Sequence, residues 1–131
     1  VIVGFPGETD NDFLDTYNFL YELEISYLHV FTYSERLNTK AMKIGGVVSK
    51  KERKKRSKML HILSDKKQRY FNSQFLDSYR SVLFENVKNG KLYGHTDNYI
   101  NVQVDGDIDL INTVQPVMLA NNHGYFVDGV I

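Results

Sequence analysis

Hydrophobic positions in the first third of the chain follow two different periods. Two continuous apolar runs, Val1–Gly4 and Ile25–Tyr33, are typical of strands that are buried on both faces, as in a parallel sheet. Between them, apolar side chains recur at helical spacing from a capping residue, Thr9, to about Glu24. The pattern predicts a β-α-β unit, and we expect its crossover to be right-handed.

The first predicted strand lacks one of its neighbours. A buried parallel strand pairs on both sides, and no residue precedes Val1 that would form the second partner. We therefore expect the chain to be the C-terminal piece of a larger protein, with the upstream part of its own polypeptide as a partner. The open edge at Val1–Gly4 predicts that the isolated piece self-associates through exposed strand edges.

A loop and a long polar helix follow. Residues 34–48 show no regular period, whereas Ser49 and Glu52 have the spacing of a capping box at the start of a helix. Helical spacing then continues to about Asn72. The first two turns of this helix carry almost nothing apolar, so we expect them to project into solvent.

After Asp77 the period changes to two, which is typical of β-strands. Asn89 and Gly90 form a strong tight-hairpin signal. The predicted strands are Arg80–Val87, Leu92–Asp105, Thr113–Ala120 and Tyr125–Ile131. Several short strands in succession indicate a small antiparallel, OB-like barrel. The expected fold class is α/β plus all-β, with an α/β part at 1–48, a connecting helix at 49–74 and a barrel at 75–131.

The composition fits one domain, or one small domain with part of another. Among the 131 residues there is no cysteine, which excludes a disulfide framework or an iron–sulfur cluster held by these residues. The four histidines lack the spacing of a metal site. No stretch approaches the ~20 apolar residues that a membrane span needs, and we expect a cytoplasmic protein with no membrane partner.

A net charge of zero hides an uneven distribution of charge. Residues 1–34 contain six acids and no Lys or Arg, residues 35–69 contain thirteen bases and three acids, and residues 70–131 contain three bases and seven acids. The densest cluster, Lys50–Lys58, lies in the predicted connecting helix. Clustered cations favour a polyanion such as RNA, and a solvated helix face is the plain structural alternative.

The turn GFPGET, at residues 4–9, has two interpretations. Glycine and proline suit any tight connection between a strand and a helix, so the turn is purely structural in the first interpretation. In the second, the turn lines a cofactor site, because ligands of parallel α/β folds bind at the carboxyl ends of the strands and glycine lets the backbone approach them.

Three segments together resemble one family of RNA-modifying enzymes. VIVGFPGET is similar to the fifth-strand turn of radical S-adenosylmethionine enzymes, and ISYLHVFTYSERLNTKA resembles the following strand and loop of their methylthiotransferase branch. GHTDNYINV, at residues 94–102, resembles part of a TRAM domain, a small β-barrel appended to such enzymes. Within the branch, LHVFTYSER and TDNYINV look most like the enzymes that modify threonylcarbamoyl-adenosine. The matching loop residues are Tyr33, Ser34, Arg36, Thr39 and Ala41, with Asn38 where the family pattern has Gly.

The resemblance implies a parent enzyme that adds a methylthio group to carbon 2 of a modified adenosine near the tRNA anticodon. It implies S-adenosylmethionine and two [4Fe–4S] clusters, whose cysteines would lie upstream, so that this piece alone would be inactive. The piece would supply the end of a partial (βα)6 barrel and part of the rim of the cofactor pocket. No catalytic residue is expected in it. The implied cofactor-binding residues are Val3, Gly4, Pro6, Glu8 and Arg36.

The implied RNA partner is tRNA, bound through its anticodon stem-loop. The residues expected to contact it are Lys50, Lys51, Lys54, Lys55, Arg56, His95, Asn98 and Tyr99. Tyr93, Tyr125 and Phe126 either offer stacking faces or belong to the barrel core. Two alternatives stay open: a non-catalytic RNA-binding module, and a methylthiotransferase that acts on a ribosomal protein.

Overall fold

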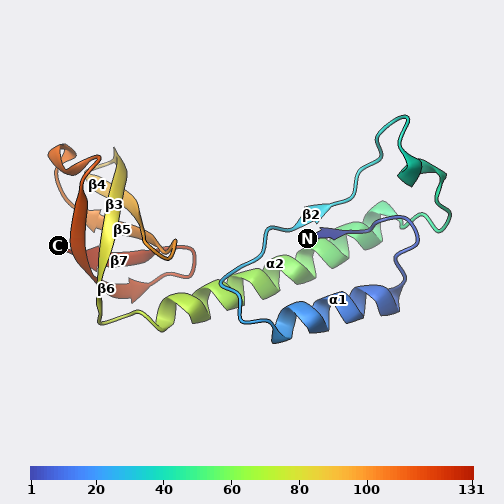
Figure 1. Cartoon of the computed structure of the whole chain (residues 1–131), viewed down its shortest axis with the longest axis horizontal. Coiled ribbons are helices and arrows are strands. Elements are labelled where there is room, and N and C mark those ends of the chain that lie inside the picture. The colour runs from blue at the N-terminus through green and yellow to red at the C-terminus, as the bar shows by residue number, and fades with distance from the viewer. The chain divides into compact units, whose positions relative to one another are not determined.

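The computed structural model describes residues 1–131 and divides them into two compact units, Val1–Lys67 and Gln68–Ile131 (Figure 1). The division falls inside a long helix, α2, which runs from Lys50 to Ser73. Each unit has a hydrophobic core of its own, so the two are described in turn.

The first unit begins with the predicted β-α-β arrangement. Strand β1 (Ile2–Val3) and strand β2 (Phe31–Thr32) pair in parallel, and helix α1 (Asp10–Glu22) connects them (Figure 1). Helix α1 starts at a capping box, in which the Thr9 hydroxyl accepts from the Asp12 N–H and the Asp12 carboxylate accepts from the Thr9 N–H. The hydrogen bonds from Thr9 hold the pKa of Asp12 below its usual value.

The prediction of a strand over the whole of Ile25–Tyr33 is wrong in extent. Only Phe31 and Thr32 form ladder pairs with β1. Upstream of them, the backbone of Leu28 bonds to the side chain of Ser64 in α2, with N–H to Oγ at 2.9 Å and Oγ–H to C=O at 3.1 Å. A helix side chain thus satisfies backbone groups that a neighbouring strand satisfies in a longer sheet.

Helices α1 and α2 pack together around the core of the first unit. That core consists of Val3, Phe13, Leu20, Leu60 and Leu63. A short 3₁₀ helix, η1 (Lys40–Lys43), interrupts the loop that the sequence predicts before α2. Neither α-helix has an apolar stretch long enough to cross a bilayer.

The second unit is a closed five-stranded barrel, with strands in the order β3-β4-β5-β7-β6 (Figure 1). Four junctions are antiparallel, and β5 pairs with β7 in parallel, so the prediction of a wholly antiparallel barrel is wrong at one junction. The parallel junction arises because β6 crosses to β3 before the chain returns beside β5. The elements are β3 (Tyr79–Lys88), β4 (Lys91–Thr96), β5 (Asn101–Asp105), the 3₁₀ helix η2 (Ile108–Leu110), β6 (Val114–Asn122) and β7 (Val127–Val130).

The single strand predicted at Leu92–Asp105 is instead the hairpin β4–β5. Its turn lies at residues 97–100, where the Ile100 N–H donates to the Thr96 hydroxyl at 2.9 Å and Tyr99 adopts a left-handed backbone with φ of 64°. The predicted turn between β3 and β4 is present, with positive φ at both Asn89 and Gly90, as a type I′ hairpin requires.

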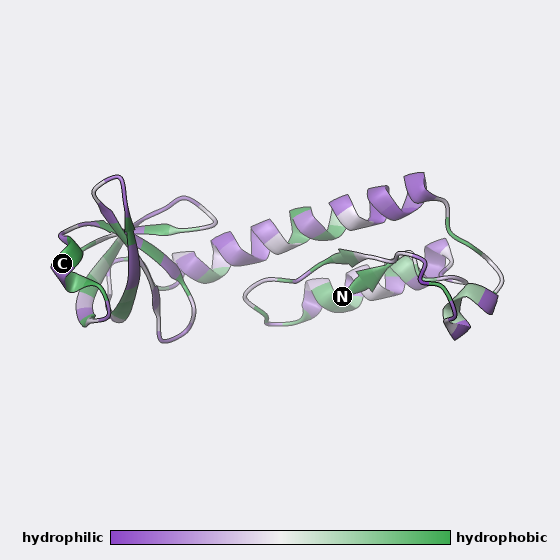
Figure 2. Ribbon diagram, turned by 90° about the horizontal axis from the view of Figure 1, so that it is seen from above, coloured by the Kyte–Doolittle hydropathy of each residue, from purple (hydrophilic) through white to green (hydrophobic).

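Apolar side chains from all five strands fill the barrel. Along these strands, green hydrophobic segments and purple hydrophilic segments are interspersed in Figure 2. Val82, Phe84, Leu92, Val117, Leu119 and Val127 are fully buried there. The last turns of α2 are fixed to the same unit, because the buried Asn72 side chain donates to the Gly124 carbonyl at 2.8 Å.

Candidate nucleic-acid interface

The basic stretch of α2 is divided between a buried face and an exposed face. The spacing of three and four residues that brings Leu60 and Leu63 into the core continues toward the helix start through Arg56 and Arg53, which are 3% and 4% exposed. The prediction that these turns project into solvent is therefore wrong for this face. The arginine stems pack where leucines pack further along the helix. The exposed face carries Lys50, Lys51, Lys54, Lys55 and Lys58.

Arg56 connects α2 to the turn between β1 and α1. Its guanidinium donates to the Glu8 carboxylate at 2.7 Å, to the Glu8 carbonyl at 3.0 Å and to the Asp10 carboxylate at 2.8 Å. The sequence predicts Arg56 as an RNA contact, and the structure contradicts this, because the side chain is buried and neutralised within the unit. Arg56 is excluded from the candidate RNA surface.

Arg53 makes a second such connection, which sequence reasoning missed. Its side chain donates to the Val48 carbonyl at 2.8 Å, to the Tyr33 carbonyl at 3.2 Å and to the Glu35 carboxylate at 2.5 Å. The hydrogen bond from Arg53 lowers the pKa of Glu35 to about 2 and raises the pKa of Arg53 in turn. The helical spacing to Leu60 and Leu63 is the signal that identifies Arg53 as buried.

Two of the exposed lysines face a hollow at the end of β2. Lys50 and Lys54 line a cavity of about 370 Å³ together with Ser34 and Ser57, and Arg53 forms part of its wall. The predicted phosphate-binding lysines thus lie beside the carboxyl end of a parallel strand, the edge at which ligands of α/β folds bind.

The predicted cofactor rim is tied into the fold of the first unit. Gly4 has φ of +77°, and a side chain there would collide with the stem of Arg53. The Gly4 N–H donates to the Glu8 carboxylate at 2.9 Å, and the Val3 carbonyl accepts from the Tyr33 N–H at 2.8 Å. Pro6, which lies between Gly4 and Glu8 in the sequence, is also buried.

These contacts limit which polar groups of the rim are available to bind S-adenosylmethionine. The Gly4 N–H, the Val3 carbonyl and the Glu8 carboxylate are already paired within the chain, so these three groups shape the turn. Arg36 is exposed in the loop after β2. The chain also lacks the thiolates that hold an iron–sulfur cluster.

The three predicted RNA contacts of the barrel gather at the hairpin β4–β5. His95 is at the end of β4 and bonds through Nδ1 to the Glu85 carboxylate at 2.8 Å. Asn98 accepts from the Thr96 hydroxyl at 2.5 Å within the turn, and the neighbouring Tyr99 is 74% exposed. The turn therefore presents an aromatic side chain to solvent on a backbone fixed by Thr96.

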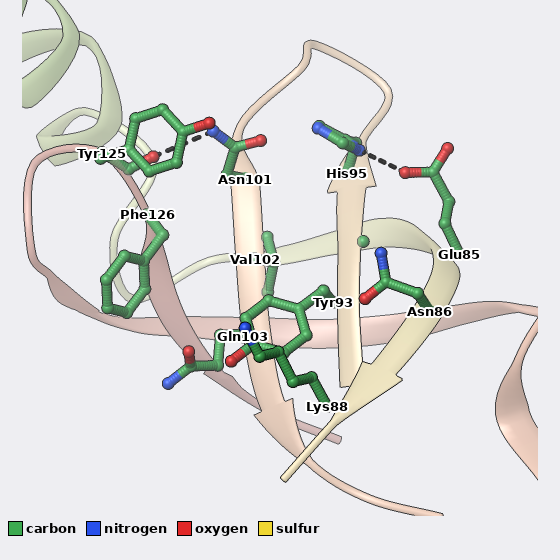
Figure 3. A pocket seen from close by; sticks show the side chains of 11 residues that line it. Glu85, Asn86, Lys88, Tyr93, His95, Asn101, Val102, Gln103, Tyr125 and Phe126 are labelled. Carbon is green, nitrogen blue, oxygen red and sulfur yellow. Dashed lines mark hydrogen bonds and ion pairs between the residues drawn. The ribbon is translucent and has the colours of Figure 1, made fainter. Parts of the chain in front are cut away.

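A second hollow, of about 430 Å³, lies on the outer face of the barrel (Figure 3). It is lined by residues of β3, β4 and β5 and by the segment before β7. Tyr93, Tyr125 and Phe126 all border it, so these three residues do not belong to the buried barrel core.

Comparisons with known proteins connect these features to one family. No family model matches the chain. Threonylcarbamoyladenosine tRNA methylthiotransferase MtaB of Bacillus subtilis is 35% identical over an alignment that covers 97% of this chain and 30% of the relative's own length. The protein of the same name from Aquifex aeolicus is 38% identical over 81% of the chain and 25% of its own length. The tRNA-2-methylthio-N(6)-dimethylallyladenosine synthase of Geobacter sulfurreducens is 35% identical over 94% of the chain and 28% of its own length.

The chain is therefore homologous, over most of its length, to tRNA methylthiotransferases, as the resemblance of its three motifs predicts. It spans less than a third of the length of these relatives.

Proposed function

We propose that the chain is the C-terminal part of a tRNA methylthiotransferase, which places a methylthio group on carbon 2 of a modified adenosine near the anticodon. The observation that supports this most strongly is the similarity to two kinds of tRNA methylthiotransferase along nearly the whole chain. The modified adenosine is the threonylcarbamoyl form in one kind of relative and the dimethylallyl form in the other. The motifs favour the first.

In this proposal, residues 1–48 complete the wall of a partial (βα)6 barrel whose other strands and cluster cysteines lie upstream. S-adenosylmethionine would supply the radical chemistry when bound in the whole enzyme. The contribution of this chain is to hold the β1–α1 turn in shape at the rim, through Arg53 and Arg56. The piece alone is inactive, because it has no cysteine to hold a cluster.

The remaining residues bind the tRNA substrate. Exposed lysines of the helix at 49–74 supply the electrostatic attraction, because clustered cations release counterions from phosphates. The barrel at 75–131 is a TRAM-type, OB-like module, an assignment that its strand order and its one parallel junction support. The turn with His95, Asn98 and Tyr99 adds contacts to the RNA of the anticodon stem-loop.

Nucleoside analysis of tRNA tests the proposed reaction. The 2-methylthio form of the modified adenosine should disappear from the tRNA of cells that lack the whole gene and return when the gene is restored. Unchanged tRNA nucleosides would contradict the proposal. A methylthio group lost from a ribosomal protein would instead identify the alternative substrate, and a change in neither would leave a non-catalytic RNA-binding module.

A further inference from the structure

We propose that the hollow on the outer face of the barrel is a binding site for one unstacked base of single-stranded RNA. The inference rests on the proposed function in taking RNA as the partner, and it adds where and how a base is held. The volume of about 430 Å³ lies within the ~300–1,000 Å³ range of small-molecule sites.

A bulge in β3 shapes one wall of this base pocket. Phe84 pairs with Gly94 and Asn86 pairs with Tyr93, so Glu85 is an extra residue without a partner in the ladder. Glu85 and Asn86 therefore both border the hollow, as Figure 3 shows. Gly94 makes this close pairing possible, because a side chain there would collide with the Leu83 carbonyl.

Aromatic side chains border the hollow from two other elements. Tyr93 comes from β4, while Tyr125 and Phe126 come from the segment before β7, on the side opposite Asn86 in Figure 3. The Asn101 side chain of β5 donates to the Tyr125 carbonyl at 3.0 Å and so fixes that segment to the sheet. A flat ring that enters the hollow can stack on these faces, and stacking of this kind accepts any base.

Polar groups at the edge of the hollow can recognise a base. The Asn86 side chain is exposed and makes no hydrogen bond, while Asn101 donates its NH₂ group to the Tyr125 carbonyl and keeps its own side-chain carbonyl oxygen free. His95 is oriented by its bond to Glu85. Amide and imidazole groups of this kind match the donors and acceptors on base edges.

The charge of the barrel favours a base over a phosphate backbone as the occupant. Residues 70–131 contain seven acids against three bases, and Lys88 is the single lysine or arginine that lines the hollow. Attraction of phosphates is therefore weak here, whereas stacking does not depend on net charge. The face between the second and third strands of an OB-type barrel is also where such folds bind oligonucleotides, and β4 and β5 hold that position here.

The test measures binding of a single-stranded oligoadenylate RNA, and of an RNA duplex, to the chain of residues 1–131. Tyr125→Ala and Tyr93→Ala are the test variants. Tyr79→Ala is the matched control, because Tyr79 is 70% exposed on β3 and Tyr125 is 73% exposed, but only Tyr125 lines the hollow. Tyr125→Leu keeps an apolar side chain without the aromatic face and covers the case in which an alanine variant fails to fold.

We expect Tyr125→Ala, Tyr93→Ala and Tyr125→Leu to weaken single-strand binding by roughly fivefold to a hundredfold, with the salt dependence unchanged. Tyr79→Ala and binding of the duplex should change little. If the three variants bind single strands as tightly as the unmodified chain, the proposal of a base pocket is wrong. The proposed RNA contact of the exposed α2 lysines is then still supported if alanine variants of those lysines lose affinity. If the unmodified chain binds no RNA, both the pocket and the RNA-binding role fail, while the nucleoside analysis still decides the reaction.

Discussion

At the scale of single residues, the arginines and lysines of the basic stretch have different tasks. Arg53 and Arg56 are buried and paired with carboxylates of the first unit, whereas the lysines between them are exposed. Arginine suits the buried positions, because its planar group can donate to several acceptors at once. A positively charged segment can therefore stabilise a fold on one helix face and attract a polyanion on the other.

Replacement of Arg56 by alanine tests its structural task. Arg56→Ala leaves the Glu8 carboxylate, whose side chain is 13% exposed, without its cation, and we expect the free energy of unfolding to fall by roughly 3 kcal/mol. Lys55→Ala is the control at the neighbouring exposed position, and it should change stability by less than about 0.5 kcal/mol. Chemical denaturation of both variants measures this, and equal stabilities would show that Arg56 is not a structural residue.

The pair of Arg53 and Glu35 predicts a dependence of stability on pH. The folded-state pKa of Glu35 is about 2, below the ordinary value of 4.5, so the charged carboxylate stabilises the fold at neutral pH. This contribution is complete above about pH 4.5 and is lost as the pH falls toward about 2. The stability gap between the unmodified chain and Glu35→Gln should therefore shrink over this range in denaturation measured at several pH values. A gap that stays constant down to about pH 2 would contradict the pairing.

At the scale of elements, the β3–β4 hairpin depends on one glycine. Gly94 faces the backbone of β3 so closely that no side chain fits there, and the adjacent bulge turns Glu85 toward His95. The hairpin thus combines a steric requirement inside the barrel with a polar pair outside it.

Gly94→Ala should force β3 and β4 apart and lower the stability of the barrel by at least ~1–3 kcal/mol. Gly45→Ala is the control, because an added side chain at Gly45 meets no atom within 4 Å. Denaturation measures the loss, and amide hydrogen exchange should show it in β3 and β4. A Gly94→Ala chain with unchanged protection of these amides would contradict the close pairing.

The elements also show what sequence alone can predict. The spacing of hydrophobic residues predicts the β-α-β unit at the start of the chain and the strands of the barrel after Asp77, because burial determines the spacing in both parts. The turn between β4 and β5 was missed, since it contains no glycine or proline: Tyr99 adopts the positive φ, and Thr96 satisfies the backbone with its side chain. Buried Arg53 and Arg56 were missed because charged residues suggest solvent, although their spacing to Leu60 is that of a core face.

The site was predicted less completely than the fold, because its geometry depends on long-range contacts. The lysines were found as a cluster in sequence, but the outer hollow of the barrel gathers residues from β3, β4, β5 and the segment before β7. No local pattern links Asn86 to Tyr125. Only closure of the barrel brings them to one surface.

At the scale of the whole molecule, positive charge is concentrated in the segment that we propose contacts the RNA phosphates. Residues 35–69 hold thirteen of the sixteen lysines and arginines, and the segments before and after them are acidic. After the pairing of Arg53 and Arg56, the exposed lysines near the start of α2 make up the densest free positive charge. RNA affinity should therefore depend on these lysines and on salt.

The most direct test is a salt titration of the binding of a labelled tRNA anticodon stem-loop to the chain of residues 1–131. The logarithm of the affinity should fall linearly with the logarithm of the salt concentration. Alanine at Lys50, Lys51, Lys54 and Lys55 should make this slope shallower by roughly 3. Alanine at the exposed Lys40, Lys43 and Lys66 is the control and should leave the slope nearly unchanged. An affinity that does not change with salt, or the same slope for the test variant and the control variant, would contradict the proposal that the α2 lysines bind RNA phosphates.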